Sequence, residues 1–131
     1  MTSEAFSLHS AIFAVIQPVL SEINCGIYDH VPQDAPFPYV SIDSQQSVER
    51  DFLSSRLDER SIYLSIWSDY QGQKQVLEII SAITGALHNV RLDVSDACVT
   101  VLKVKNTRSL MDADGATYTG KMTLSCMMTY S

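Results

Sequence analysis

Residue types that commonly hold metals or phosphates are scarce in this sequence. Its three histidines, His9, His30 and His88, fall on different predicted elements, and no cysteine or carboxylate stands near them at the spacing of a zinc site. Its five glycines stand alone, so no glycine-rich phosphate loop follows any predicted strand. We therefore expect no metal centre, no nucleotide site and no cofactor.

Cysteine is also rare. Cys25, Cys98 and Cys126 are odd in number and far apart, which fits neither a disulfide framework nor a zinc site. Cys98 and Cys126 lie in strand patterns and Cys25 precedes a glycine, so we expect inert, buried thiols of a reducing compartment and not catalytic nucleophiles. This use of cysteine favours synthesis in the cytoplasm.

Basic residues are few, with nine lysines and arginines against 15 acidic residues and a net charge of −6. A nucleic-acid-binding surface needs clustered basic side chains, so sequence-specific nucleic acid is not an expected partner. No apolar run approaches the roughly 18 residues of a membrane span, and no basic leader precedes an apolar segment near Met1. Membrane insertion and secretion are therefore not expected.

The chain does contain enough apolar material for one core. Hydrophobic residues make up 46% of its 131 residues and charged residues 18%, as in globular proteins. A chain of this length buries roughly two-thirds of the surface that it exposes when unfolded. Because it contains no internal repeat, low-complexity tract or linker, we predict a single domain over residues 1–131.

The stretch from Ser61 to Asn89 is the predicted centre of that core. Apolar residues alternate with polar or aromatic ones from Ser61 to Trp67, which is typical of a strand with one buried face. After a polar loop the period changes, and apolar residues recur at helical spacing from Val76 to Leu87. A sheet with one apolar face and a helix with one apolar stripe pack together, which predicts an α+β domain.

The N-terminal part contains a second predicted helix and two strands. The helix begins near Thr2 or Ser3 and should end or kink at Pro18, because the proline ring clashes with the preceding turn. A short strand is predicted around residues 25–29, followed by a proline-rich extended connection over residues 31–39. The next strand covers residues 39–44.

The polar stretch from Gln45 to Arg60 is predicted to form the long tip of a β-hairpin. In this stretch Phe52, Leu53 and Leu57 stand among charged residues. Loops of this length without regular structure are uncommon unless they are disordered or make contacts. A disordered tip and an interface arm that becomes ordered on assembly are equally compatible with the residues.

The remaining strands complete a mostly antiparallel sheet of about four strands with two helices on one face. A short strand is expected at residues 90–94, a longer one at 98–105, a loop at 106–116, and a long alternating strand at 117–130. Gly85 lies within a predicted helix. Close packing of the N-terminal helix over this position is slightly favoured as the reason for a glycine there. Trp67 is expected to be covered within the domain or its own oligomer, with a partner contact as the alternative.

Several of these segments together resemble a known family. They are Tyr28-Asp-His-Val-Pro-Gln-Asp-Ala-Pro-Phe-Pro-Tyr39-Val40, then Ile66-Trp-Ser68, Gly72 and the helix to His88, and last Asp112-Ala-Asp-Gly115 with the closing strand. In this order they resemble the tail terminator, or tail completion, proteins of bacteriophages, prophages and gene transfer agents. The resemblance covers nearly the whole chain, and residues 31–39 are its most specific part.

The resemblance implies a structural virion protein without catalytic activity. Several copies, commonly six, would form a ring that caps the tail tube, stops its elongation and contacts the head-tail connector protein. The expected partners are therefore other copies of the chain, the tail-tube protein and the connector, first in the host cytoplasm and then in the virion tail. A ring needs exposed arms or edges, and the candidate interface residues are Glu49, Arg50, Asp51, Phe52, Leu53, Arg56, Leu57, Asp112 and Asp114.

Two other functions remain open at this point. A head-closure or neck adaptor protein would differ in its partner but not in its fold class. A small-ligand binding module or enzyme on a helix-on-sheet scaffold is less favoured, and a deep pocket converging on Asp43, His88 or Cys126 would support it.

Overall fold

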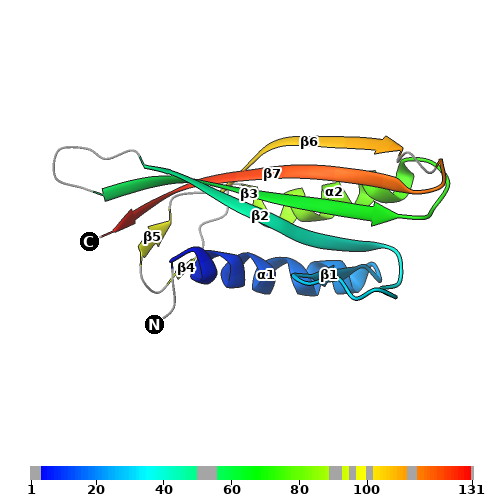
Figure 1. Cartoon of the computed structure of the whole chain (residues 1–131), viewed down its shortest axis with the longest axis horizontal. Helices are drawn as coiled ribbons and strands as arrows, with labels where there is room; N and C mark the ends of the chain where they lie inside the picture. Colours follow the sequence, from blue (N-terminus) through cyan, green and yellow to red (C-terminus); the bar gives the residue numbers. More distant parts are fainter. Residues whose placement is uncertain are drawn as a thin grey trace.

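One mixed sheet of seven strands carries two helices on the same face (Figure 1). The structure is a computed structural model that describes residues 4–49, 56–88, 93–94, 97–99, 102–111 and 115–130. In chain order the elements are α1 (Glu4–Glu22), β1 (Gly26–Tyr28), β2 (Tyr39–Glu49), β3 (Arg56–Ser68), α2 (Lys74–Leu87), β4 (Asp93–Val94), β5 (Ala97–Val99), β6 (Lys103–Met111) and β7 (Tyr118–Tyr130).

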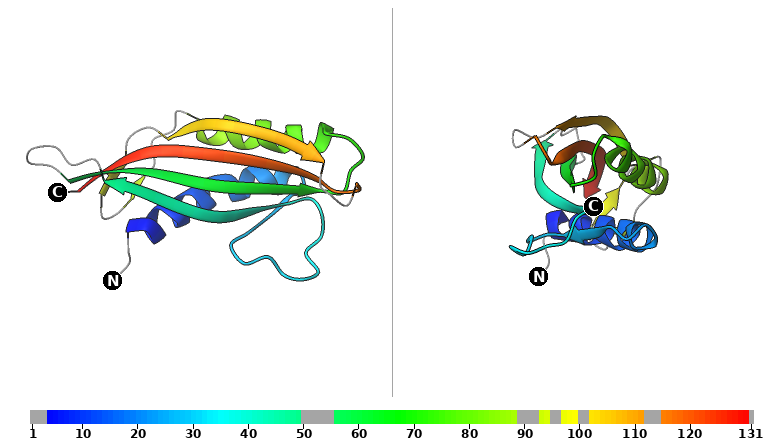
Figure 2. Two further views of the ribbon diagram at one scale, coloured as in Figure 1. Left: turned by 45° about the horizontal axis from the view of Figure 1, so that its top comes forward. Right: turned by 90° about the vertical axis from the view of Figure 1, so that its right-hand side faces the viewer.

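The long strands β2, β3, β7 and β6 are antiparallel neighbours in that order. The short strand β1 pairs in parallel with the start of β2, and β5 pairs with the end of β7 that β6 leaves open. The sheet curves around the two helices (Figure 2). The predicted α+β class and the placement of both helices on one face are thus confirmed, although the sheet has more strands than the four expected.

The strand and helix at the predicted centre of the core pack as expected. Ile62, Leu64 and Ile66 of β3 are buried, and so is the apolar stripe of α2 that faces the sheet. Ser68 organises the turn between the two elements, because its hydroxyl accepts a hydrogen bond from the backbone N–H of Tyr70 at 3.1 Å and donates one to the Gln75 side chain. The buried residues of α2 are Val76, Ile79, Ile80, Ile83 and Leu87.

The N-terminal helix does not end at Pro18. α1 continues to Glu22, with Pro18 inside its last turns, so the prediction of a helix end at this residue was wrong. Proline removes one backbone donor, which leaves the carbonyl of Ala14 without its helical partner. Both residues lie on the exposed side of α1, where water can satisfy that carbonyl. The opposite side of α1 buries Leu8, Ile12, Ile16 and Leu20.

The predicted hairpin is present, but most of its tip is regular strand and not loop. β2 and β3 are paired residue by residue out to Glu49 and Asp58, so residues 45–49 and 56–60 extend the sheet. The polar composition of this stretch masked its strand character, because its polar side chains pair with one another across the two strands. The hairpin projects from one end of the molecule, the end at which α1 begins and β7 ends (Figure 1).

The predicted loop at residues 106–116 was also largely wrong. Residues 106–111 belong to β6, an edge strand that pairs with β7 from Lys103↔Ser125 to Met111↔Tyr118. Its side chains are mostly exposed, so it lacks the apolar alternation that identifies a half-buried strand. The long closing strand is confirmed as β7, with Met122, Leu124 and Cys126 buried on its inner side.

Gly120, and not Gly85, is the glycine that permits close packing. A Cβ at Gly85 would meet no atom within 4 Å, so the predicted approach of another element over this position was wrong. A Cβ at Gly120 would lie 2.8 Å from Cγ1 of Val76, in α2. Gly120 therefore lets the helix lie directly on β7.

Candidate assembly surfaces

Three of the nine candidate interface residues lie on the described part of the hairpin that β2 and β3 form. Glu49 ends β2, and Arg56 and Leu57 begin β3, so these three lie together at the far end of the ladder. The remaining candidates lie outside the described residues; they are Arg50, Asp51, Phe52, Leu53, Asp112 and Asp114. The interface role of all nine therefore stays a prediction.

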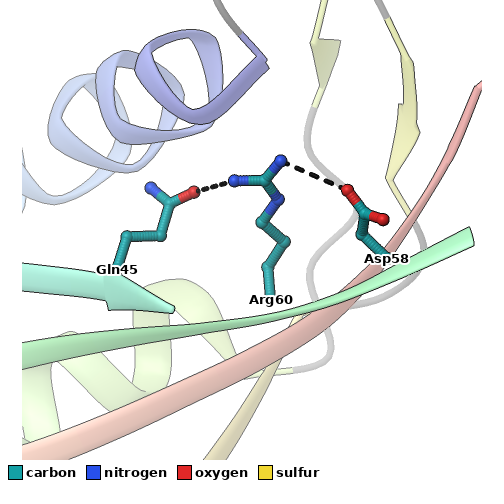
Figure 3. A network of polar contacts seen from close by, with 3 residues as sticks. All are labelled: Gln45, Asp58 and Arg60. Atoms are coloured by element: carbon teal, nitrogen blue, oxygen red, sulfur yellow. Dashed lines mark hydrogen bonds and ion pairs between the residues drawn. The ribbon is translucent and has the colours of Figure 1, made fainter. Parts of the chain in front are cut away.

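A buried polar network joins the two strands of the hairpin (Figure 3). Arg60 donates hydrogen bonds from Nη1 to Gln45 Oε1 at 2.8 Å and from Nη2 to Asp58 Oδ2 at 3.3 Å. The Asp58 side chain is only 2% exposed and the Arg60 side chain 10%. Because Gln45 lies on β2 and the other two on β3, the network joins the two strands in the outer part of the hairpin, where Asp58 pairs with Glu49.

This network was missed at the level of sequence, although its signal was available. Asp58 and Arg60 continue the alternation of Ile62, Leu64 and Ile66, which places both charges on the buried face of β3. Two opposite charges in that position indicate a paired, buried couple, since an unpaired buried charge is strongly disfavoured. The described part of the hairpin is thus paired strand with a buried polar contact between its two strands.

On the opposite face of the same strands, charged groups are solvated. Lys105 of β6 lies 3.9 Å from Glu59 of β3, and their side chains are 59% and 25% exposed. Tyr63 donates a hydrogen bond to Gln46 at 3.0 Å across the hairpin. Exposed ion pairs of this kind contribute little to stability, typically about 0–1 kcal/mol.

Trp67 is covered by its own domain, as the sequence favoured. Its ring stacks on Tyr39 with centroids 6.3 Å apart, and Nζ of Lys121 lies 5.4 Å from its centroid. The Lys121 amine also donates a hydrogen bond to Ser65 Oγ at 2.7 Å, and Ser65 in turn donates to Asp43. A partner is not needed to explain the position of Trp67.

Among the described residues, most of the large apolar side chains that are exposed lie at the end of the molecule opposite the hairpin. Phe37 precedes β2, Tyr70 precedes α2, Leu77 lies in the first turn of α2, and Met111 ends β6. All four side chains are between 42% and 54% exposed. Ile23, just after α1, belongs to the same end. These element ends gather on the side away from the hairpin (Figure 1). Five of the six exposed large apolar side chains of the described residues therefore lie at this end, whereas Val48, 42% exposed, lies on the hairpin.

Cys25 and Cys126 are buried free thiols, as predicted, whereas the side chain of Cys98 lies outside the described residues. Burial raises the pKa of each thiol from 9.0 to about 11, and the nearby Arg60 opposes part of this effect at Cys126. Because the thiolate is the nucleophile, both groups are poorly reactive near neutral pH.

These raised pKa values predict a loss of stability in alkaline solution. The stabilising effect is fully present below pH 9, where both states keep the proton, and it is lost as pH rises toward 11 because only the unfolded chain ionises. Each thiol should contribute up to about 3 kcal/mol over this interval. Urea unfolding at pH 8, 9.5 and 10.5 should show a steeper decline for the wild type than for Cys25→Ala/Cys126→Ala. Parallel declines of the two proteins would contradict this prediction.

A deep pocket converging on Asp43, His88 and Cys126 was the feature that would have supported a small-ligand binding module. An open groove of about 560 Å³ between α1 and β1 is lined by residues that include Phe13, Gln17 and Tyr28, but by none of Asp43, His88 and Cys126. Asp43 accepts a hydrogen bond from Ser41 at 2.7 Å on the outer face, and Nδ1 of His88 accepts one from the Val104 N–H at the end of α2. The three residues thus do not converge.

Within the described part of the chain, no three histidine, cysteine or acidic side chains gather as metal ligands, and no helix is long and apolar enough to cross a membrane. His9 lies 3.7 Å from Asp29, a separation suited to an ion pair when the imidazole is protonated.

Two comparisons with known proteins agree with this fold. A family model described as "Tail completion protein gp17" matches residues 10–129. Among solved structures, a chain from the virion of a native gene transfer agent particle is similar with a TM-score of 0.86 and 15% identity, covering 98% of this chain and 99% of that one. No curated protein sequence matches.

The helix-on-sheet fold is thus shared with a chain of a virion. The chain belongs to the tail completion protein family, which confirms the resemblance noted in its sequence. It is a structural protein of phage-like tails.

Proposed function

We propose that several copies of this protein, with six as the expected number, close into a ring on the head-proximal end of the tail tube. The ring stops tube elongation and presents its other face to the head-tail connector, without catalysing a reaction. It forms in the host cytoplasm and remains in the virion tail. The main support for this proposal is membership of the tail completion family. We take completion of a tail to mean that its growth ends and that its end is made ready for the head.

The two ends of the molecule fit a ring with two different faces. The hairpin end offers paired strands joined by the Gln45–Arg60–Asp58 network, and the other end offers exposed apolar residues such as Phe37, Tyr70 and Met111. Proteins that repeat around a closed ring present all equivalent ends on the same side. One face can then bind the tube and the other the connector.

Tube growth in the presence of the protein tests the function. Purified tail-tube protein is polymerised with and without this chain, and tube lengths and ends are recorded by electron microscopy. We expect shorter tubes with a ring at one end. Tubes of unchanged length and bare ends, together with binding to isolated connector, would support the neck adaptor function instead.

Shortening the hairpin should separate folding from assembly. Replacing residues 50–55 with Asn-Gly removes Arg50, Asp51, Phe52 and Leu53, yet leaves only a short loop between the paired Glu49 and Asp58. Because the Arg60 network is retained, the urea midpoint of the monomer should stay close to that of the wild type, while capping of tubes should weaken at least several-fold. Unchanged capping by the shortened protein would exclude the tip as a contact.

A further inference from the structure

The open groove of about 560 Å³ lies between the end of α1 and β1. The helix ends at a turn in which Asn24 adopts a left-handed backbone (φ 55°), as asparagine often does after a helix. The chain then enters β1 beside the helix, and the two elements form the walls of the groove. Gln17 and Asn24 contribute side-chain amides to its lining, and among the described residues no charged side chain lines it. Any charge at the groove therefore comes from residues beside it.

The residues next to the groove in the chain are acidic. Glu22 ends α1 and Asp29 follows β1, and both side chains are exposed. Asp29 lies 3.7 Å from His9 yet stays 73% exposed, and Glu22 has no ion-pair partner among the described residues. Asp34 adds a third exposed carboxylate in the connection to β2, and the chain contains no lysine or arginine before Arg50. This side of the molecule therefore favours a positively charged occupant.

Strand β6 carries the complementary charge. It contains Lys103, Lys105 and Arg108, all exposed, and no acidic residue. Lys105 lies 3.9 Å from Glu59, whereas Lys103 and Arg108 have no ion-pair partner among the described residues. Arg108 stands directly opposite Lys121 of β7, and like charges in that relation are destabilising. A carboxylate from a partner would offset this repulsion.

The basic strand and the acidic groove lie on opposite sides of the molecule. β6 runs along one long border, whereas α1 and β1 run along the other, as both views from the side show (Figure 1 and Figure 2). β6 and β1 both lie in the half away from the hairpin (Figure 1). A second copy placed alongside, at the same height, thus brings its β6 to the groove of the first. Because two different surfaces meet, the contact repeats from copy to copy and can close a ring.

We propose that the groove between α1 and β1 binds the basic strand β6 of a second copy of this chain, with Arg108 pairing with the carboxylates of Glu22 and Asp29. The planar donors of a guanidinium suit carboxylates and the amide oxygens of Gln17 and Asn24. This inference rests on the proposed ring function and specifies how its subunits join. It leaves the hairpin and the opposite end of each copy for other tail components.

Carbodiimide cross-linking of the full-length protein tests the contact directly, because this reagent joins a lysine amine only to a carboxylate that it touches. Ordinary and isotope-labelled protein are mixed and assembled on tubes of the tail-tube protein, and mass spectrometry identifies the pairs that come from different copies. We expect such pairs between Lys103 or Lys105 and Glu22, Asp29 or Asp34. A ring in which neither lysine forms one of these pairs overturns the contact while leaving the ring function standing.

Charge reversal on each side provides a second test. Arg108→Glu alone, and Glu22→Arg/Asp29→Arg together, place like charges at the contact and should each weaken ring formation at least about tenfold. Combining all three substitutions restores opposite charges and should recover most of the loss. Lys74→Glu and Glu78→Lys, on the exposed side of α2, are the matched controls and should leave ring formation unchanged. Because all these side chains are exposed, urea midpoints should stay close to that of the wild type.

The outcomes separate the two proposals. Weaker rings in both reversed variants, with recovery in the combined one, support the groove contact. Ring formation equal to the wild type in either reversed variant overturns it, and so does a loss that the combined variant fails to recover; the ring function stands in both cases. Wild-type protein that neither forms a ring nor shortens tubes overturns the function, and the groove contact with it.

Discussion

Replacing Asp58 with alanine should destabilise the protein by about 3–5 kcal/mol, because Arg60 would keep a buried positive charge without its carboxylate partner. The Asp58 side chain is almost completely enclosed, and its Oδ2 lies 3.3 Å from Nη2 of Arg60. Water cannot readily replace the lost partner in such a place. The free energy of unfolding, measured with urea, gives the effect directly.

Two further variants show whether burial is the cause. Lys105→Met removes the solvated ion pair with Glu59 on the other face of the sheet and should change stability by about 1 kcal/mol or less. Asp58→Leu/Arg60→Met replaces both buried charges by apolar groups and should recover much of the stability that the single alanine variant loses. Similar small losses of stability for Asp58→Ala and Lys105→Met would show that this buried network does not stabilise the hairpin.

Gly120→Ala should destabilise the protein by about 1–3 kcal/mol through overpacking between α2 and β7. The added Cβ would lie 2.8 Å from Cγ1 of Val76 and 3.2 Å from Cδ1 of Ile66. Ile66 can adjust the end of its side chain, but valine in a helix has one strongly preferred rotamer. Relief therefore requires the helix to move away from the sheet.

Gly85→Ala is the matched control for this substitution. It adds the same methyl group at an exposed helical position where no atom lies within 4 Å. Alanine is a better helix former than glycine, so this variant should gain up to about 1 kcal/mol. Opposite signs for the two variants in urea unfolding support the packing described for Gly120, and a loss at both positions would contradict it.

The parts of the fold that follow from sequence are those with apolar alternation or helical period. Residues 61–67, α2 and β7 each bury one face, and that pattern identified them. The outer half of the hairpin and β6 lack it, since Gln45, Arg60 and Arg108 meet polar partners or solvent instead of the core. The predicted helix end at Pro18 was wrong because an exposed proline is tolerated late in a helix, where water replaces the lost hydrogen bond.

The candidate site was predictable in location but not in organisation. The charged stretch around Glu49 was equally compatible with a disordered tip and an interface arm, and the structure places its described part on a paired hairpin. The alternation along β3 indicates that Asp58 and Arg60 lie on the buried face, whereas the contact of Arg60 with Gln45 depends on how β2 pairs with β3. That pairing, like the strand order of the sheet, arises only when segments distant in sequence are brought together.

The mass of the protein in solution, measured by light scattering at several concentrations with and without tail-tube protein, tests the central claim most directly. Assembly by contact predicts a defined multiple of the monomer mass, formed or strengthened when tube protein is present. A protein that stays monomeric at every concentration, with tube protein added, would contradict the account.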